Sequence, residues 1–374
     1  MNELLTTATA AGYVASLDIL DSATTASEIE GGNLNYAFRV SSSTSTASVF
    51  VKQAPNYIKC LGPDYALPST RIAVEVDALR CYSTLAGAKF VPAVLHFDAA
   101  RAIMVLEDLT DRVLLRDALA SSSASVAAAH ATAIGTFAAR LHCASGEAST
   151  LAELRARFSN ADMVGITRAY VFEKPLDAAD ETNRHSAALE ARVIALRADP
   201  GITEAFRHAR EEIFDGKPEA LLHGDLHAGS VMVRPDGEGG VKVIDAEFAF
   251  VGGRGVDVGM VIAGYCFAWA AACASRGADG SVLMLGALRA FWAAYAAEGD
   301  AVVWTDATAI AGCDLVRRLL GAAHSPDVEA IEDASAKAKA EHLALDLGEA
   351  LLRGEADSID ALCARAERAR AERE

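Results

Sequence analysis

Two short apolar runs that end in acidic residues restrict the fold of this chain more than any other feature of its sequence. The first, LLHGDLHAGSVMV at 221–233, places Asp225 between two β-type runs. The second, VKVIDAEFAF at 241–250, ends with Asp245 and Glu247. Strands on both sides of a short loop hold its carboxylate in place. Paired loops of this kind present a base on one loop and metal-binding carboxylates on the other, which is the division that phosphoryl transfer needs.

The first hundred residues predict a small β-rich unit with one main helix. Apolar and β-branched runs at 37–40 and 48–53 predict two strands, and the polar segment 41–47 between them predicts a hairpin loop. Residues 71–85 have apolar side chains at helical spacing, which predicts a helix. A short apolar strand is predicted at 102–106.

This N-terminal unit also contains a glycine turn, a lysine and a glutamate that suit phosphate binding. Gly31-Gly32 joined to Asn33 predicts a tight turn whose amides can approach a phosphate closely. Lys52 lies in an otherwise apolar strand, where an ammonium group is costly unless it is paired. Glu75 on the predicted helix is its natural partner. Together with the two acidic loops, these residues form a specific ordered set.

The rest of the chain is predicted to be helical apart from the short β insert that carries the acidic loops. The predicted organisation is an α+β chain with an N-lobe at 1–106, a hinge at 107–113 and a large, mostly helical C-lobe at 114–374. The uncharged stretch 258–275 is long enough to cross a membrane. It is rich in Ala and Gly and lacks a flanking basic cluster, so we expect a buried core helix.

Charge and cysteine content narrow the partners and the compartment. The chain has 34 basic and 51 acidic residues, a formal net charge of −17, so general nucleic-acid binding is not expected. Its seven cysteines are scattered without a CxxC pair, which predicts reduced thiols and no zinc site. The N-terminal segment lacks the basic region of a signal peptide. We therefore expect a cytoplasmic protein without a membrane partner.

The motifs resemble those of the protein-kinase-like small-molecule kinases of the aminoglycoside and choline kinase type, and most closely those of the 5-methylthioribose kinases. The likeness is carried by residues 32–40 (GNLNYAFRV), 51–54 (VKQA), 223–230 (HGDLHAGS), 243–259 and 312–331. Ser230 is diagnostic, because most of the superfamily has Asn there, whereas the methylthioribose kinases combine Ser with a DxE motif. The resemblance covers residues 32–331 and implies a bilobal protein-kinase-like fold.

For the nucleotide, the resemblance implies ATP binding between the lobes. The residues implied to bind it are Gly32, Asn33, Asn35, Lys52, Glu75, Glu107 and Leu109. Lys52 is expected to hold the phosphates, with Glu75 orienting it, while the hinge is expected to bond adenine through its backbone. Asn33 is also expected to contact the acceptor substrate.

For the reaction, the resemblance implies that Asp225 is the catalytic base and faces the C1 hydroxyl of a sugar acceptor. Asp245 and Glu247 are implied as Mg²⁺ ligands, and Arg317 and Arg318 as substrate contacts beside Asp225. The implied product is 5-methylthioribose 1-phosphate, a step of methionine salvage. The resemblance also implies a homodimer.

The chain departs from the family pattern at three places. Ala246 stands where Pro is common within the DxE motif, and 251–253 (VGG) replaces an aromatic residue and Pro. Gly31 stands where an Asp often precedes the turn. None of these changes removes a catalytic group, so they bear on substrate affinity more than on the type of reaction.

Other interpretations of the same residues stay open. The chain is compatible with another sugar or amino-alcohol kinase of this fold, or with a catalytically silent ATP-binding pseudokinase. The HxDxH pattern of His223, Asp225 and His227 also resembles a metallohydrolase cluster, although it lacks further ligands. His223 is expected to brace its loop, and His227 either braces the loop or touches substrate. Asp257 is expected to be structural, because it begins the apolar helix, where an Asp satisfies free amides. The resemblance to the kinase-like fold also implies that a residue at this position ties down the catalytic loop.

Overall fold

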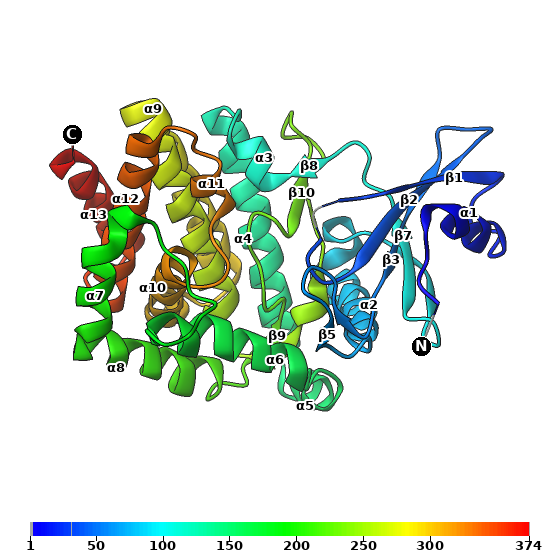
Figure 1. The fold of residues 1–374 in the computed structure, drawn as a ribbon, viewed down its shortest axis with the longest axis horizontal. Helices are drawn as coiled ribbons and strands as arrows, with labels where there is room; N and C mark the ends of the chain where they lie inside the picture. Colours follow the sequence, from blue (N-terminus) through cyan, green and yellow to red (C-terminus); the bar gives the residue numbers. More distant parts are fainter. Residues whose placement is uncertain (1–2, 31, 374) are drawn as a thin grey trace.

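A five-stranded antiparallel sheet forms the N-terminal part, with strand order β1-β2-β3-β7-β6 (Figure 1). Its strands are β1 (Ala23–Glu28), β2 (Tyr36–Ser42), β3 (Ser48–Gln53), β6 (Val94–Asp98) and β7 (Ile103–Glu107). The predicted hairpin is confirmed, since β2 pairs with β3 in register from Tyr36 opposite Gln53. The computed structural model describes residues 3–30 and 32–373, so Gly31 of the predicted turn lies outside the described residues.

Two helices cover opposite faces of this sheet. The helix α1 (Thr7–Ala15), which the sequence did not predict, packs on one face against Ile103 and Val105. The helix α2 (Arg71–Tyr82) packs on the other face with Met104 and Leu106, and it continues as a π-helical turn instead of extending regularly to residue 85. Side chains alternate between the two faces of a strand. Lys52, opposite Met104, therefore lies on the face that α2 covers.

A small two-stranded hairpin, β4 (Tyr57–Ile58) and β5 (Gly62–Ala66), follows the sheet strand β3 and precedes α2. The backbone amide of Cys60 in this hairpin donates a hydrogen bond to the carbonyl of Asn33 at 2.9 Å. The hairpin thus supports the loop between β1 and β2, which carries the predicted phosphate-covering residues.

The C-terminal part is a large helical lobe that lies opposite the sheet lobe in Figure 1. Its α-helices are α3 (Leu115–Leu119), α4 (Ala124–Gly146), α5 (Ala148–Arg157), α6 (Ala161–Thr167), α7 (Glu190–Ala198), α8 (Pro200–His208), α9 (Gly255–Glu298), α10 (Trp304–Leu320), α11 (Pro326–Glu329), α12 (Ala334–Leu352) and α13 (Ile359–Glu372). In this part of the chain, which was predicted to be helical, α7 ends at Ala198 and α8 begins at Pro200. Proline favours the first position of a helix, and the Asp199 side chain caps α8 by accepting from the Gly201 amide.

The long apolar helix α9 is a core element of this lobe. Its backbone leaves the helical region at Gly277, where φ is 59°, so two helices meet there at a sharp turn. The indole of Trp269 donates to Ser281 Oγ at 2.8 Å across the turn. By length and composition α9 qualifies as a membrane span, yet 78% of its most apolar window is buried inside the fold. The predicted buried core helix at 258–275 is confirmed.

A two-stranded sheet and a three-stranded sheet bring the acidic loops together. The strand β9 (Ala220–Leu222) pairs with β12 (Phe250–Gly252), and β10 (Val231–Val233) pairs with β11 (Val241–Val243) and β8 (Val113–Leu114). The Asp225 loop joins β9 to β10, and the Asp245 loop joins β11 to β12. The strand before each loop pairs with the strand after the other loop, so the two loops lie side by side.

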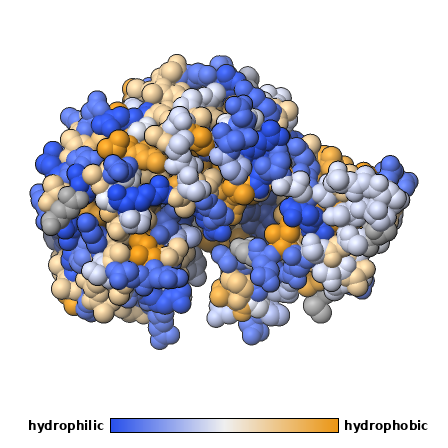
Figure 2. All heavy atoms as spheres, turned by 90° about the horizontal axis from the view of Figure 1, so that it is seen from above, coloured by the Kyte–Doolittle hydropathy of each residue, from blue (hydrophilic) through white to orange (hydrophobic). Residues whose placement is uncertain are grey.

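The surface seen from above is mostly hydrophilic, and its hydrophobic side chains are scattered singly or in small groups (Figure 2). A recess separates the large and the small part of the molecule in this view. The α+β bilobal architecture predicted from the sequence is confirmed, and the acidic loops lie on the side of the helical lobe that faces α2.

Candidate active site

Lys52 forms a buried ion-pair cluster that joins the two lobes. Its Nζ donates to Glu75 Oε2 at 2.7 Å and to the carboxylate of Asp245, and it lies 3.8 Å from Glu247 Oε1. Burial lowers the pKa of Lys52, but the three carboxylates outweigh it and hold the pKa above its ordinary value. The lysine therefore stays protonated. The structure brings together the predicted Lys52–Glu75 pair and both predicted metal ligands.

Asp245 is the most exposed member of this cluster, with 52% of its side chain accessible. Its backbone adopts the left-handed conformation, with φ 65° and ψ 46°, which Asp tolerates better than most residues. Although half of the side chain is accessible, the surrounding protein atoms displace enough water to raise the pKa of the carboxyl; Lys52 lowers it by more, so the pKa lies below its ordinary value. Asp245 is thus an ionised oxygen donor.

Glu247 is only 2% exposed and is held by residues of the other lobe. Asn35 Nδ2 donates to both of its carboxylate oxygens, at 2.9 and 3.0 Å, and Arg71 Nε lies 3.2 Å from Oε2. The resemblance implied that Asn35 covers ATP phosphates, which stays a prediction; in the structure its amide binds Glu247. The part of Arg71 in this contact was not predicted.

Asp225 lies beside two side chains, His227 of its own loop and Arg318 of α10. Its Oδ2 is 3.4 Å from His227 Nε2, and its Oδ1 is 3.9 Å from Arg318 Nη2. Burial raises the pKa of the carboxyl, but His227 and the two arginines lower it by a larger amount. The pKa therefore falls well below its ordinary value. The structure thus places the predicted base as an ionised carboxylate next to a predicted substrate contact.

Asp257 braces the Asp225 loop through hydrogen bonds to the loop backbone. Its carboxylate accepts from the amides of His223 and Gly224, at 2.8 and 2.9 Å, and His142 Nε2 lies 3.2 Å from Oδ2. Asp257 thus ties down the catalytic loop, as the resemblance implied, and it binds amides of this loop and not those of its own helix. Gly224 has φ +81°, and a Cβ there would lie 2.3 Å from the Phe248 carbonyl oxygen, so the close approach of the two loops requires glycine.

The side chain of His223 ties the two acidic loops together. Its Nε2 lies 2.9 Å from the carbonyl oxygen of Ile244, and its Nδ1 accepts from the Asp225 amide at 3.3 Å. The Ile244 amide in turn donates to the carbonyl of Ser230 at 2.9 Å. The bracing interpretation of His223 thus agrees with its contacts.

Ser230 is also used within the loop. Its buried hydroxyl accepts from the His227 amide at 2.9 Å and lies 2.9 Å from the Asp225 carbonyl oxygen. A hydroxyl that bonds to the loop backbone on both sides braces the loop that carries Asp225. His227 also accepts from the Gly229 amide at its Nδ1, at 2.9 Å, so it combines bracing with the contact to Asp225.

Arg317 and Arg318 are oriented by Asp314, a residue that sequence reasoning missed. The two oxygens of Asp314 accept from Arg317 Nε at 2.6 Å and from Arg318 Nε at 3.1 Å, and the carboxylate is 1% exposed. Residues three and four positions apart share one face of a helix. The spacing from Asp314 to the arginine pair was therefore a signal for this contact.

The hinge residues lie where the chain passes from β7 to the C-lobe. The Glu107 amide donates to the Ala93 carbonyl at 2.9 Å, so this amide is already bonded. The Leu109 amide, in contrast, has no hydrogen-bond partner within residues 3–30 and 32–373. Asp108 between them is fixed by Arg39 Nε, at 2.6 Å.

Gly32 and Asn33 are exposed in the loop between β1 and β2. Both lie on the N-lobe side, in the chain segment that leads to Asn35. Their predicted contacts with phosphate and substrate remain predictions.

Mg²⁺ suits the donors of this site. It is commonly bound by one or two carboxylates together with phosphate oxygens of the substrate, which matches Asp245 and Glu247. In the described part of the chain, no group of three His, Cys, Asp or Glu side chains is arranged to hold a metal ion. The HxDxH residues therefore do not form the ligand cluster that a metallohydrolase of the predicted kind would need.

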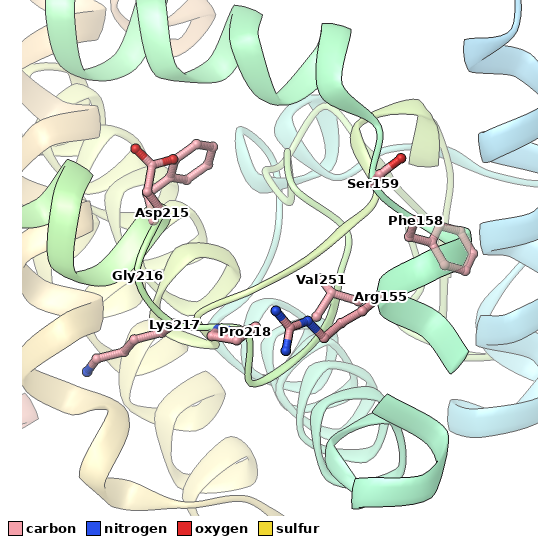
Figure 3. A pocket seen from close by; sticks show the side chains of 9 residues that line it. Arg155, Phe158, Ser159, Asp215, Gly216, Lys217, Pro218 and Val251 are labelled. Atoms are coloured by element: carbon pink, nitrogen blue, oxygen red, sulfur yellow. The ribbon is translucent and has the colours of Figure 1, made fainter. Parts of the chain in front are cut away.

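A separate pocket of about 290 Å³ lies in the C-lobe between α5 and the segment around residue 216. It is lined by Arg155, Phe158, Ser159, Phe214, Asp215, Gly216, Lys217, Pro218 and Val251 (Figure 3). None of the predicted site residues lines it. The site thus comprises the clustered side chains at the lobe junction and not this pocket.

Comparisons with known proteins show which proteins this chain is similar to. Residues 25–295 match the phosphotransferase enzyme family. The chain is 33% identical to a methylthioribose kinase of Yersinia enterocolitica, over 91% of the chain and 92% of that protein. It is 32% identical to a methylthioribose kinase of Pectobacterium carotovorum, over 91% of each protein. Among solved structures, the aminoglycoside phosphotransferase APH(4)-Ia with ADP and hygromycin B is 13% identical, with a TM-score of 0.48, and covers 94% of this chain and 100% of that one.

Proposed function

This chain belongs to the phosphotransferase enzyme family, and we propose that it is an ATP-dependent kinase of the C1 hydroxyl of 5-methylthioribose. The product is 5-methylthioribose 1-phosphate, an intermediate of methionine salvage. The acceptor is supported by the methylthioribose kinases that match about nine-tenths of the chain, and by the Ser230 and DxE features.

One observation carries the reaction type: the ionised Asp225 carboxylate lies 3.9 Å from Arg318, on a loop hydrogen-bonded to the loop of Asp245. An ionised carboxylate at this point orients an acceptor hydroxyl and takes its proton as the bond to phosphorus forms. The arginine pair donates hydrogen bonds to oxygens and offsets negative charge in the transition state. Such catalysis consists mainly of positioning and electrostatic stabilisation.

On the nucleotide side, Lys52 holds phosphate oxygens, and Glu75 keeps its ammonium group in place. Asp245 and Glu247 are the residues that hold Mg²⁺, and when bound this ion neutralises phosphate charge. The loop with Gly32 and Asn33 covers the phosphates, and Asn33 also reaches the acceptor. The amide of Leu109 and the backbone of Glu107 hold adenine at the hinge.

The alternative acceptors and the pseudokinase interpretation fit less well. A choline-like acceptor is a cation, and the Arg317–Arg318 pair beside Asp225 repels cations. A pseudokinase is expected to lack one of Lys52, Asp225 or Asp245, and all three are present at the lobe junction.

We extend the proposal to the organisation of the protein. Residues 1–106 form the nucleotide phosphate-binding lobe, 107–113 the hinge, and 114–374 the lobe with the catalytic loop, metal ligands and acceptor site. The protein works in the cytoplasm as a homodimer, with a small-molecule sugar substrate and without nucleic-acid or membrane partners.

A coupled ADP-release assay tests this function. The protein receives ATP and Mg²⁺ with 5-methylthioribose, ribose, choline or homoserine in parallel, and Asp225→Asn is the control. Turnover on methylthioribose alone, lost in the control, is the expected result. Turnover only on another acceptor would leave the kinase chemistry and overturn the substrate.

A further inference from the structure

One contact between the lobes that the nucleotide chemistry does not already explain is the one between Asn35 and Glu247. The two residues are 212 positions apart, and the Asn35 amide meets both carboxylate oxygens at 2.9 and 3.0 Å. Asn35 lies at the end of the phosphate-covering loop, and Glu247 is a metal-ligand candidate. A single side chain thus links the loop over the phosphates to the metal loop.

Arg71 fixes the orientation of Asn35. Its Nε and Nη2 donate to Asn35 Oδ1 at 3.2 and 3.0 Å. The amide oxygen of Asn35 therefore accepts from Arg71, so its NH₂ group faces Glu247. The direction of the Asn35 amide is set by the network and has no freedom to reverse.

Arg71 itself is anchored by the backbone around it. Its Nη1 donates to the carbonyls of Pro55, Leu67 and Pro68, at 2.9, 3.1 and 2.9 Å, and its Nη2 donates to the Leu34 carbonyl at 2.9 Å. Arg71 is 3% exposed, and its N–H groups donate to backbone carbonyls that are fixed in position. The planar fork of Arg is suited to this task, and the single ammonium group of Lys is not.

The charges of the cluster explain why this anchoring matters. The carboxylates of Glu75, Asp245 and Glu247 face the two cations Lys52 and Arg71. Without Arg71 and Asn35, the buried Glu247 carboxylate keeps only Lys52, at 3.8 Å, which is beyond hydrogen-bond distance. It would then lose the contacts that define its position.

We propose that Asn35 and Arg71 are positioning residues for Glu247. They hold its carboxylate in one orientation toward the metal and couple the phosphate-covering loop to the metal loop. Groups that hydrogen-bond metal-binding carboxylates in this way typically affect metal affinity by about 10–100-fold. The inference rests on the proposed ATP and Mg²⁺ chemistry, but it does not depend on which acceptor is phosphorylated.

The test is calorimetric ATP binding to the full chain, in EDTA and at increasing Mg²⁺. Asn35→Ala is expected to raise the Mg²⁺ concentration for half-maximal ATP affinity by about 10–100-fold, a larger change than that of its ATP affinity in EDTA. Asn183→Ala is the matched control, because it removes an Asn that donates to two carbonyls, at 2.6 and 2.9 Å, elsewhere in the C-lobe. It is expected to change neither quantity.

Hydrogen exchange of the metal-free protein gives a second readout. Asn35→Ala is expected to speed exchange at 32–35 and at 246–249, on both sides of the contact, and Asn183→Ala at neither. An Asn35→Ala protein with an unchanged Mg²⁺ requirement would overturn the proposal. So would ATP binding by the unaltered protein that ignores Mg²⁺. Failure of the acceptor assay alone would overturn the substrate and leave this inference standing.

Discussion

Arg318 Nη2 lies 3.9 Å from Asp225 Oδ1. One buried carboxylate fixes the arginine, and another fixes the loop that carries Asp225. Asp314 binds Arg318 through Nε at 3.1 Å. Asp257 binds the first amides of the Asp225 loop, at 2.8 and 2.9 Å. The separation of base and guanidinium therefore depends on two residues that face the protein interior.

Asp314→Asn is expected to weaken acceptor binding selectively. The change keeps the size of the side chain but leaves Arg317 and Arg318 without their shared charge partner. Hydrogen bonds to charged groups contribute about 1.5–3 kcal/mol, so we expect KM for the acceptor to rise by about 10–100-fold with KM for ATP unchanged. Steady-state kinetics measures both. Asp199→Asn, which removes an exposed contact with Arg353, is the control, and an equal rise of both KM values would contradict the prediction.

Asp257→Asn is expected to loosen the catalytic loop. An Asn side chain has one oxygen acceptor, so one of the two loop amides loses its partner inside the protein. We expect the free energy of unfolding to fall by about 1–3 kcal/mol and kcat to fall more than KM changes. Urea denaturation and kinetics on the same preparation measure the two effects. Unchanged stability would show that the loop does not depend on this carboxylate.

Lys52→Met is expected to abolish ATP binding and to destabilise the fold. It leaves Glu75 buried without its cation, and breaking a buried pair from one side costs about 3–5 kcal/mol. The double variant Lys52→Met/Glu75→Leu is expected to recover most of this stability while ATP binding stays lost. Thermal denaturation with and without ATP measures both properties. Recovery of ATP binding in the double variant would contradict the assigned role of Lys52.

The contribution of Asp225 to the free energy of unfolding is expected to decrease as the pH falls into the acid range. Its pKa is depressed below the ordinary value of 3.8, so the ionised carboxyl favours the folded state. This contribution is complete above the unfolded pKa and is lost as pH falls toward the folded pKa. The difference in unfolding free energy between the unaltered protein and Asp225→Asn should stay constant near neutral pH. It should then fall at acid pH by up to about 1.4 kcal/mol per pH unit. A difference that grows at acid pH would contradict the depressed pKa.

The sequence predicted those parts of the site that depend on local pattern. The strand and helix patterns were enough to predict the pairing of Lys52 with Glu75. The acidic loops were predicted because their acidic residues follow short apolar runs typical of strands. The break between α7 and α8 was signalled by Pro200, which favours a new helix start. The turn of α9 at Gly277 had only a single glycine as its signal.

The buried partners of charged residues were harder to predict. Arg71 begins the predicted helix, but its side chain reaches the carboxylate of Glu247 in the other lobe, as does that of Asn35. For Asp257, the helix start suggested amides of its own helix, and only the resemblance implied the contact with the catalytic loop that the structure shows. Such pairings depend on how distant segments of the chain pack together, and no local pattern records that.

The decisive experiment compares phosphorylation of 5-methylthioribose by the unaltered protein and by Asp225→Asn, with the product identified by ³¹P NMR. We expect a phosphate on C1 and a loss of kcat on the order of 10³-fold or more in the variant, with its fold and ATP binding retained. Phosphate on another hydroxyl, or nearly normal turnover by Asp225→Asn, would show that Asp225 is not the base for the C1 hydroxyl.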